Sequence, residues 1–207
     1  MPFTVAGRNR MLDAWANSAS GAPVTYASLH TTVPDDVTGA TEVSGGSPAY
    51  ARKAVTFASA ASASINKNGT NPVFDVPAST TVYFVGFWTA VTSGTFMGWA
   101  PINGGTANNY ATALTGTNVI TSYAHGLSNG NNVILRAGPG ALPTGLNATT
   151  IYFVISATTD TFQLSLTSGG SAVSISASGE LYWQQVIGES FGSQGTLTVS
   201  TSVLQIN

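Results

Sequence analysis

The chain has no cysteine and very little charge. Of its 207 residues, 7% are Asp, Glu, Lys or Arg, whereas about a quarter of an ordinary soluble domain is charged. The absence of cysteine excludes disulfide frameworks, thiolate metal sites and cysteine nucleophiles. Six Lys and Arg residues against eight Asp and Glu give a net charge of -2, so the chain lacks the basic face that nucleic-acid binding requires. We therefore expect no nucleic-acid partner.

Long apolar runs are also missing. The longest lie near residues 82–88 and 151–155, far short of the ~20 residues that a membrane-spanning helix needs. The N-terminal run MPFTVAGRNRML has no hydrophobic signal core. We therefore expect no membrane partner and synthesis in the cytoplasm of the producing cell.

Side chains that could carry catalysis or hold a metal are scarce. The histidines, His30 and His125, lie far apart in the sequence, and neither HExxH nor GxSxG occurs. We expect His30 to end a strand with its ring satisfied by the backbone, and His125 to lie in a solvated turn. Asp35 and Asp36 are adjacent, but the oxygen-rich loop of a calcium site is missing around them. The sequence therefore predicts no metal, no cofactor and no enzymatic activity.

Threonine, serine and glycine are abundant instead, with 28, 23 and 23 residues, beside 43% hydrophobic residues. Short β-prone runs alternate with turn signals over most of the length. The nearly continuous apolar run 80–88 predicts a strand covered on both faces, paired in a hairpin with 94–100. Residues 151–155 and 162–166 predict a second hairpin, and 66–72 is interpreted as a turn.

One segment, residues 6–19, has the apolar spacing of an amphipathic helix. Trp15 is its bulky anchor, while Arg8 and Arg10 lie off the apolar stripe. Two interpretations stay open. The helix packs on the sheet of its own domain, or it docks on a partner chain through Arg8, Arg10 and Trp15.

The β pattern is interrupted by a Gly/Asn-rich linker at 104–109 and then restarts. The amphipathic segment 196–206 is predicted to complete a sheet begun in the first half, with a kink near 201–203. The predicted fold is all-β: a β-sandwich with one short N-terminal helix and an inserted small antiparallel β domain. We assign 1–107 with 187–207 to the sandwich, and 108–186 to the insertion.

Aromatic residues are the remaining candidates for ligand contact, since a sugar-stacking platform needs exposed rings. Those considered are Trp88, Trp99, Trp183, Tyr83, Tyr110, Tyr123 and Tyr152. Trp88 and Tyr152 lie inside apolar runs, which favours core packing. Trp99, Tyr123 and His125 lie nearer loops, and we predict these three as surface-contact residues.

Several runs carry a family resemblance: MPFTVAGRNRMLDAWA, VTYASLHTTVP, EVSGGSPAYARKAVTF, NPVFDVPASTTVYFVGFW, SGTFMGWAPI and ESFGSQGTLTVSTSVLQI. Over roughly 1–107 and 187–207, the chain resembles small tail-fibre-like or minor tail virion proteins of tailed phages that infect actinobacteria. The run from HGLSNGNNVILRAG to SGGSAVSI resembles a small β module found in phage tail and fibre proteins.

The resemblance implies a non-enzymatic structural protein on the virion exterior, most simply a minor tail component, with the insertion facing outward. Its implied partners are other virion proteins, copies of itself and the host cell surface. Two alternatives stay open, a capsid decoration protein and a host-glycan-binding module. The resemblance assigns no catalytic residues.

Overall fold

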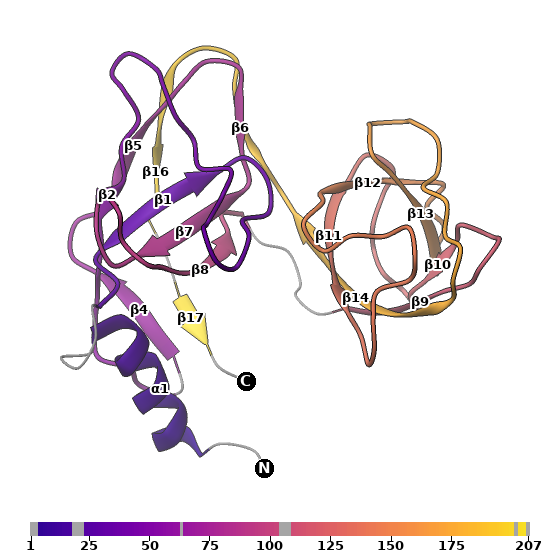
Figure 1. Cartoon of the computed structure of the whole chain (residues 1–207), viewed down its shortest axis with the longest axis horizontal. Coiled ribbons are helices and arrows are strands. Elements are labelled where there is room, and N and C mark those ends of the chain that lie inside the picture. The colour runs from indigo at the N-terminus through magenta and orange to yellow at the C-terminus, as the bar shows by residue number, and fades with distance from the viewer. Residues whose placement is uncertain (1–3, 18–22, 63, 104–108, 201–202, 206–207) are drawn as a thin grey trace. The chain divides into compact units, whose positions relative to one another are not determined.

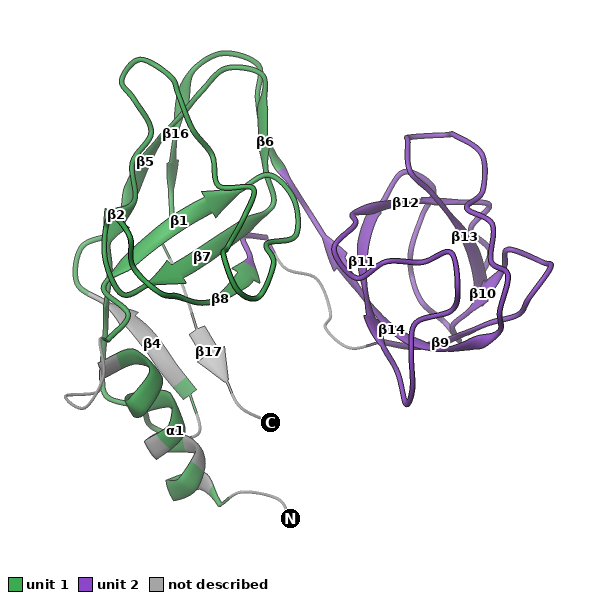
Figure 2. Ribbon diagram, viewed as in Figure 1, with its two compact units in different colours: residues 1–100, 189–207 green, residues 101–188 purple. Residues whose placement is uncertain are grey.

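The computed structural model describes residues 4–17, 23–62, 64–103, 109–200 and 203–205 (Figure 1). In these residues short antiparallel strands dominate and one helix is present, which confirms the predicted all-β class with a short N-terminal helix. The chain divides into two compact units, residues 1–100 with 189–207 and residues 101–188 (Figure 2). We call them unit 1 and unit 2.

The helix α1 (Val5–Asn17) packs within unit 1. Its stripe residues Leu12 and Ala16 are buried. The Trp15 indole Nε1 donates a hydrogen bond of 2.9 Å to the Met97 carbonyl oxygen. The indole ring also meets two buried phenylalanine rings edge to face, those of Phe57 and Phe87. The contacts of the Trp15 indole therefore support the interpretation in which the helix packs on its own unit.

The largest sheet of unit 1 has four strands in the order β2-β1-β7-β8. Its strands are β1 (Tyr26–His30), β2 (Lys53–Ala54), β7 (Phe84–Trp88) and β8 (Phe96–Pro101). Every residue of β7 is buried, as the apolar run 80–88 predicts, and β7 and β8 are neighbours as expected of the predicted hairpin. The run breaks at Tyr83, which separates β7 from β6 (Thr80–Val82).

Smaller sheets complete unit 1 and join the two ends of the chain. They pair β15 (Glu189–Phe191) with β6, β16 (Gly195–Thr198) with β5 (Val73–Val76), and β17 (Val203–Gln205) with β4 (Ser64–Asn68), which also pairs with β3 (Thr56–Phe57). The segment 196–206 thus pairs with strands of the first half, as predicted, and it contains two short strands, β16 and β17. The predicted kink near 201–203 falls at residues 201 and 202, which lie outside the described residues. The predicted turn at 66–72 is wrong in its first half, because β4 continues through Asn68 between two partner strands.

A buried polar chain lies in the four-stranded sheet. His30 is fully buried; its Nδ1 donates to the Ala40 carbonyl (3.0 Å), and its Nε2 accepts from the Ser28 hydroxyl (2.7 Å). The Trp88 indole donates to the same hydroxyl oxygen at 2.7 Å. Burial lowers the pKa of His30, so the ring is held neutral. A Cβ on Gly86 would lie 2.5 Å from both His30 Nε2 and Ser28 Oγ, which only glycine avoids.

Unit 2 is a closed barrel of six strands in the order β10-β13-β12-β11-β14-β9. The predicted hairpin 151–155 with 162–166 is confirmed as the pair β12 and β13. The first strand, β9, was not predicted. The strands are β9 (Asn109–Ala113), β10 (Ile120–Thr121), β11 (Asn132–Ala137), β12 (Tyr152–Ile155), β13 (Thr161–Ser165) and β14 (Gly179–Val186).

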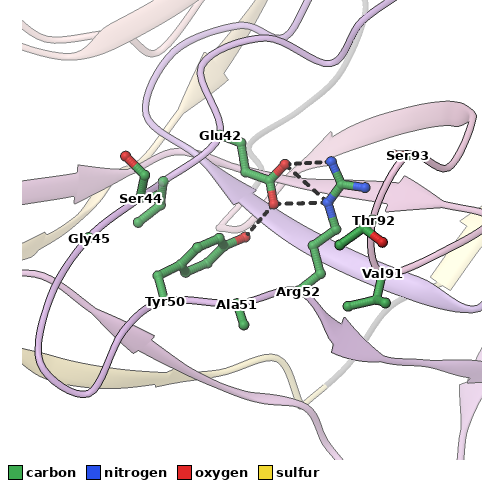
Figure 3. A pocket seen from close by; sticks show the side chains of 10 residues that line it. Glu42, Ser44, Gly45, Tyr50, Ala51, Arg52, Val91, Thr92 and Ser93 are labelled. Carbon is green, nitrogen blue, oxygen red and sulfur yellow. Dashed lines mark hydrogen bonds and ion pairs between the residues drawn. The ribbon is translucent and has the colours of Figure 1, made fainter.

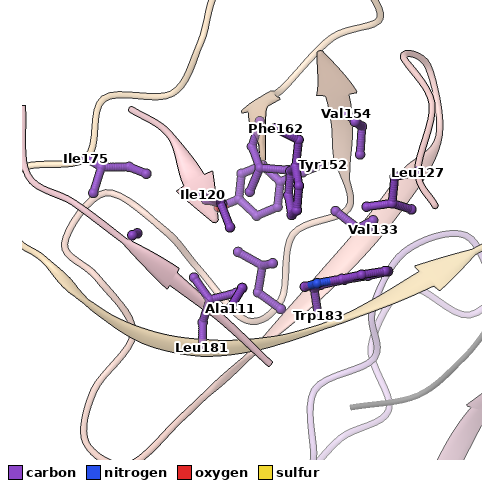
Figure 4. Packing of buried hydrophobic residues seen from close by; sticks show 13 residues of the cluster. Ala111, Ile120, Leu127, Val133, Tyr152, Val154, Phe162, Ile175, Leu181 and Trp183 are labelled. Atoms are coloured by element: carbon purple, nitrogen blue, oxygen red, sulfur yellow. The ribbon is translucent and has the colours of Figure 1, made fainter. Parts of the chain in front are cut away.

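The barrel encloses its own hydrophobic core (Figure 4). The Trp183 indole donates to the buried Ser122 hydroxyl at 2.9 Å, and that hydroxyl donates to the Tyr110 carbonyl at 2.8 Å. In both units, therefore, a buried tryptophan indole donates its hydrogen bond to the hydroxyl of a buried serine. Around these groups pack Ile120, Leu135, Tyr152, Val154, Phe162, Leu164 and Leu181.

Candidate functional site

The run EVSGGSPAYAR, which carries part of the family resemblance, forms a shallow hollow of about 540 Å³ in unit 1 (Figure 3). Three polar side chains of this run, Glu42, Tyr50 and Arg52, meet at it. Tyr50 and Arg52 are two residues apart in extended chain, so their side chains project to the same side. The remaining lining comes from residues 43–45 and 51 of the same run and from Val91, Thr92 and Ser93.

The guanidinium of Arg52 is engaged on both its edge and its face. It forms an ion pair with Glu42, with Nη2 to Oε2 at 2.7 Å and Nε to Oε1 at 3.0 Å. Its Nη1 donates to the Ala90 carbonyl at 3.3 Å. Its Cζ lies 3.3 Å from the centroid of the Trp88 ring, a cation–π contact. Few donors are left for a ligand, so we interpret this arginine as a brace between the loop and the sheet.

Tyr50 completes the brace. Its hydroxyl accepts from the Leu29 amide at 2.8 Å and donates to Glu42 Oε1 at 3.2 Å. Its ring stacks on that of Phe74. Burial, together with the neighbouring Glu42 carboxylate, raises the pKa of this phenol, so it stays protonated at physiological pH and has no tendency to act as a base.

The loop that follows Glu42 is held from the other end of the chain. Gln194 accepts from the Ser47 amide at 2.8 Å and donates to the Pro48 carbonyl at 2.7 Å. The GGSPAYAR and ESFGSQG runs, distant in sequence, are therefore joined through one amide side chain. The hollow and its loop form a cross-braced structural feature.

The residues predicted to dock on a partner are only partly described. The side chains of Arg8 and Arg10 lie outside the described residues, and Trp15 is engaged within unit 1. Trp99, predicted as a surface contact, is half-buried; its ring edge packs on Phe84 at 5.0 Å between centroids, and its Nε1 lies 3.4 Å from Asp36 Oδ1.

Two further predicted contact residues lie in unit 2. Tyr123 is 88% exposed, as a surface contact requires. His125 is half-buried, and the prediction of a solvated turn side chain is wrong for it. Its Nδ1 accepts from the Leu127 amide (3.0 Å), its Nε2 donates to the Thr161 carbonyl (3.2 Å), and its ring packs against Phe162. The ring therefore anchors its turn to the barrel.

Sequence reasoning did not single out Glu42, Tyr50 and Arg52 as a cluster, although it identified the run that contains them. The spacing of Tyr50 and Arg52 could have predicted that their side chains share one side. No local pattern predicts that the loop brings Tyr50 back to Glu42, eight residues earlier in the chain. Within the described residues, no group of three or more His, Cys, Asp or Glu side chains is placed to hold a metal ion. None of the described helices has the length and apolar character that crossing a membrane demands.

These features define an all-β structural module whose described charged groups chiefly brace loops. The family described as Podophage GP4 fiber I protein gp80 matches residues 2–124. The chain therefore belongs to this family of phage fibre proteins. The match runs beyond residue 107 into the first two strands of the barrel, and it does not include 187–207. No curated protein and no solved structure matches the chain.

Proposed function

We propose that this chain is a non-enzymatic, minor tail or tail-fibre-like component on the exterior of a virion, in a phage of actinobacteria. The observation that carries the proposal is the family match to a phage fibre protein over more than half of the chain. As a member of that family, the chain is a virion structural protein that associates with other virion components. Its position as a minor tail part is our inference.

We further propose a division of labour between 1–107 with 187–207, which attaches to the virion, and 108–186, which faces outward. The cross-braced loop at Glu42, Arg52 and Gln194 supports an attachment role, because a rigid surface loses little entropy on docking. In this proposal Trp15 holds α1 against its own unit, while Arg8 and Arg10 contact a neighbouring virion protein or a second copy.

Copy number tests the position in the particle. Quantitative mass spectrometry of purified virions should find a handful of copies per particle. A number in the hundreds, near that of the capsid protein, would contradict the tail assignment and favour capsid decoration. Absence from purified virions would contradict both.

A further inference from the structure

Two tyrosines and one arginine fall in a single row on the outer face of the barrel, and a third tyrosine lies in the turn after a neighbouring strand. Tyr182 on β14 is paired with Tyr110 on β9 and, on its other side, with Arg136 on β11. The β9–β10 ladder ends at the pair Thr121 and Thr112, and Tyr123 follows two residues later, in the turn after β10. The strands β11, β14 and β9 lie side by side along one side of the barrel (Figure 1).

The alternation of each strand turns this row outward. Trp183 and Leu181 flank Tyr182 and are buried in the core, and Ala111 beside Tyr110 is buried as well. Tyr110 is 48% exposed and Tyr123 is 88% exposed. The rings of Tyr110 and Tyr182 form an edge-to-face pair with their centroids 5.9 Å apart. Exposed aromatic rings that lie next to one another form a candidate contact surface.

The few charges of unit 2 gather at this row. Its sequence contains three charged residues, Arg136, Asp160 and Glu180. Arg136 is in the row itself, and Glu180 accepts a hydrogen bond from the Tyr110 hydroxyl, which raises the pKa of that phenol. Asp160 accepts from the Ala124 amide at 2.8 Å, next to Tyr123. A unit otherwise built of hydroxyl, amide and apolar side chains thus places its ionic groups around exposed rings.

We propose that this row and Tyr123, which together we call the tyrosine row (Tyr110, Tyr123, Tyr182 and Arg136), bind a neutral carbohydrate chain. The rings supply flat apolar faces with a polar edge, which suit the apolar face of a sugar ring. Glu180 and Arg136 supply an acceptor and donors for sugar hydroxyls. The inference rests on the proposed outward placement of the barrel, and it names the ligand class of that outward face.

The chemistry beside the row favours a carbohydrate over other partners. One cation with an adjacent carboxylate gives no net positive field, which disfavours nucleic acid and acidic polymers. On β9 and β14 the outward neighbours of the tyrosines are polar, namely Thr112 and Gln184, whereas on β11 the outward neighbour of Arg136 is Ile134, which is buried. A protein-docking centre is normally desolvated and surrounded by apolar contacts, whereas rings set among hydroxyl and amide groups suit a ligand that presents hydroxyls throughout.

The test is affinity electrophoresis of the full chain in native gels that contain a neutral polysaccharide, using a panel of dextran, mannan, galactan and glucan polymers. At least one should retard the wild-type chain. The variants Tyr110→Ala and Tyr182→Ala should each weaken binding about tenfold, the factor that corresponds to 1.4 kcal/mol. Tyr123→Phe, which keeps the ring and removes only the hydroxyl, should stay within about twofold of wild type.

The matched control is Leu166→Ala, which truncates a side chain that is 63% exposed in the same barrel but outside the row; it should bind as wild type does. Circular dichroism and thermal melting establish that each variant is folded, and Tyr123→Ala serves if the paired tyrosines prove necessary for folding. Binding should change little between about 0.05 and 0.5 M salt, because no net charge drives it.

Two results would overturn the inference. One is the absence of retardation by every polymer with a folded wild-type chain, and the other is an equal loss of binding in Leu166→Ala. If tyrosine variants instead lose incorporation into virions without any sugar binding, the row is a protein contact and the carbohydrate assignment is wrong. The virion role is tested separately by copy number, so either proposal can fail alone.

Discussion

Replacing Ser28 by alanine should destabilise unit 1 far more than the loss of one small side chain suggests. The Ser28 hydroxyl accepts from the Trp88 indole and donates to His30 Nε2, each at 2.7 Å. Alanine can do neither, and both partners are buried. Each buried polar group left without a partner costs about 1–3 kcal/mol, so the two groups together predict a loss of roughly 2–6 kcal/mol in the free energy of unfolding of unit 1.

The barrel offers a matched comparison for this variant. In Ser122→Ala, the Trp183 indole loses its acceptor, but the other partner is a backbone carbonyl oxygen that keeps a second lone pair. We therefore expect a smaller loss, of about 1–3 kcal/mol, confined to unit 2.

Hydrogen–deuterium exchange with mass spectrometry across a urea series separates the two effects, because peptides from β7 and β14 report on different units. Ser28→Ala should lower the urea concentration at which β7 peptides lose protection from exchange and leave that of β14 peptides unchanged. Ser122→Ala should lower it for β14 and leave it unchanged for β7. A Ser28→Ala chain within about 0.5 kcal/mol of wild type would refute the reasoning, because it would mean that the buried partners are satisfied in another way.

Three further outcomes are expected. Because burial lowers the pKa of His30 below its ordinary 6.5, the unfolded chain binds a proton where the folded chain does not. The free energy of unfolding should therefore fall as the pH drops below about 6.5, level off below the folded-state pKa, and lose this slope in His30→Gln when urea titrations are compared between about pH 5 and 7. Arg52→Lys keeps the charge but loses the paired contacts to Glu42 and the flat contact on Trp88, so it should cost about 1–2 kcal/mol by urea titration; Lys53→Ala, which breaks a looser ion pair at 3.5 Å, should cost less than about 0.5 kcal/mol. Gln194→Ala removes both side-chain bonds to the loop and should speed exchange of the Ser47 amide about fivefold, with overall stability within about 0.5 kcal/mol of wild type; an unchanged Ser47 rate would mean that the loop is held by other contacts.

The parts of the fold that sequence predicts are those with a strong local pattern. The apolar run of β7 and the alternation in β13 both appear in the structure where expected. The strand β9 was missed because its inward residues are Ala111 and Ala113, whose small side chains give a weak hydrophobic signal. Closure of the barrel depends on the pairing of β9 with β14, a long-range match that no local pattern contains.

The candidate sites illustrate the same limit. The run containing Tyr50 and Arg52 was recognisable in sequence, but its partner Trp88 reaches it only through the sheet. Of the tyrosine row, Tyr123 was predicted as a contact residue and Tyr110 was considered, whereas Tyr182 was not singled out. Only the registers of the β9–β14 and β11–β14 ladders align Tyr110, Tyr182 and Arg136, and register is fixed by tertiary packing.

Several of the few charged side chains hold turns and loops in place. Asp35 accepts hydrogen bonds from the Thr38 hydroxyl and from the amides of Thr38, Ala40 and Val37, so its carboxylate closes its own turn and its pKa is lowered. Asp160 and the Glu42–Arg52 pair likewise brace loops. Charges engaged in this way leave hydroxyl, amide and aromatic groups to make up much of the outward chemistry. Contacts made by such a surface should respond weakly to ionic strength, as the proposal of a neutral carbohydrate ligand for the tyrosine row also predicts.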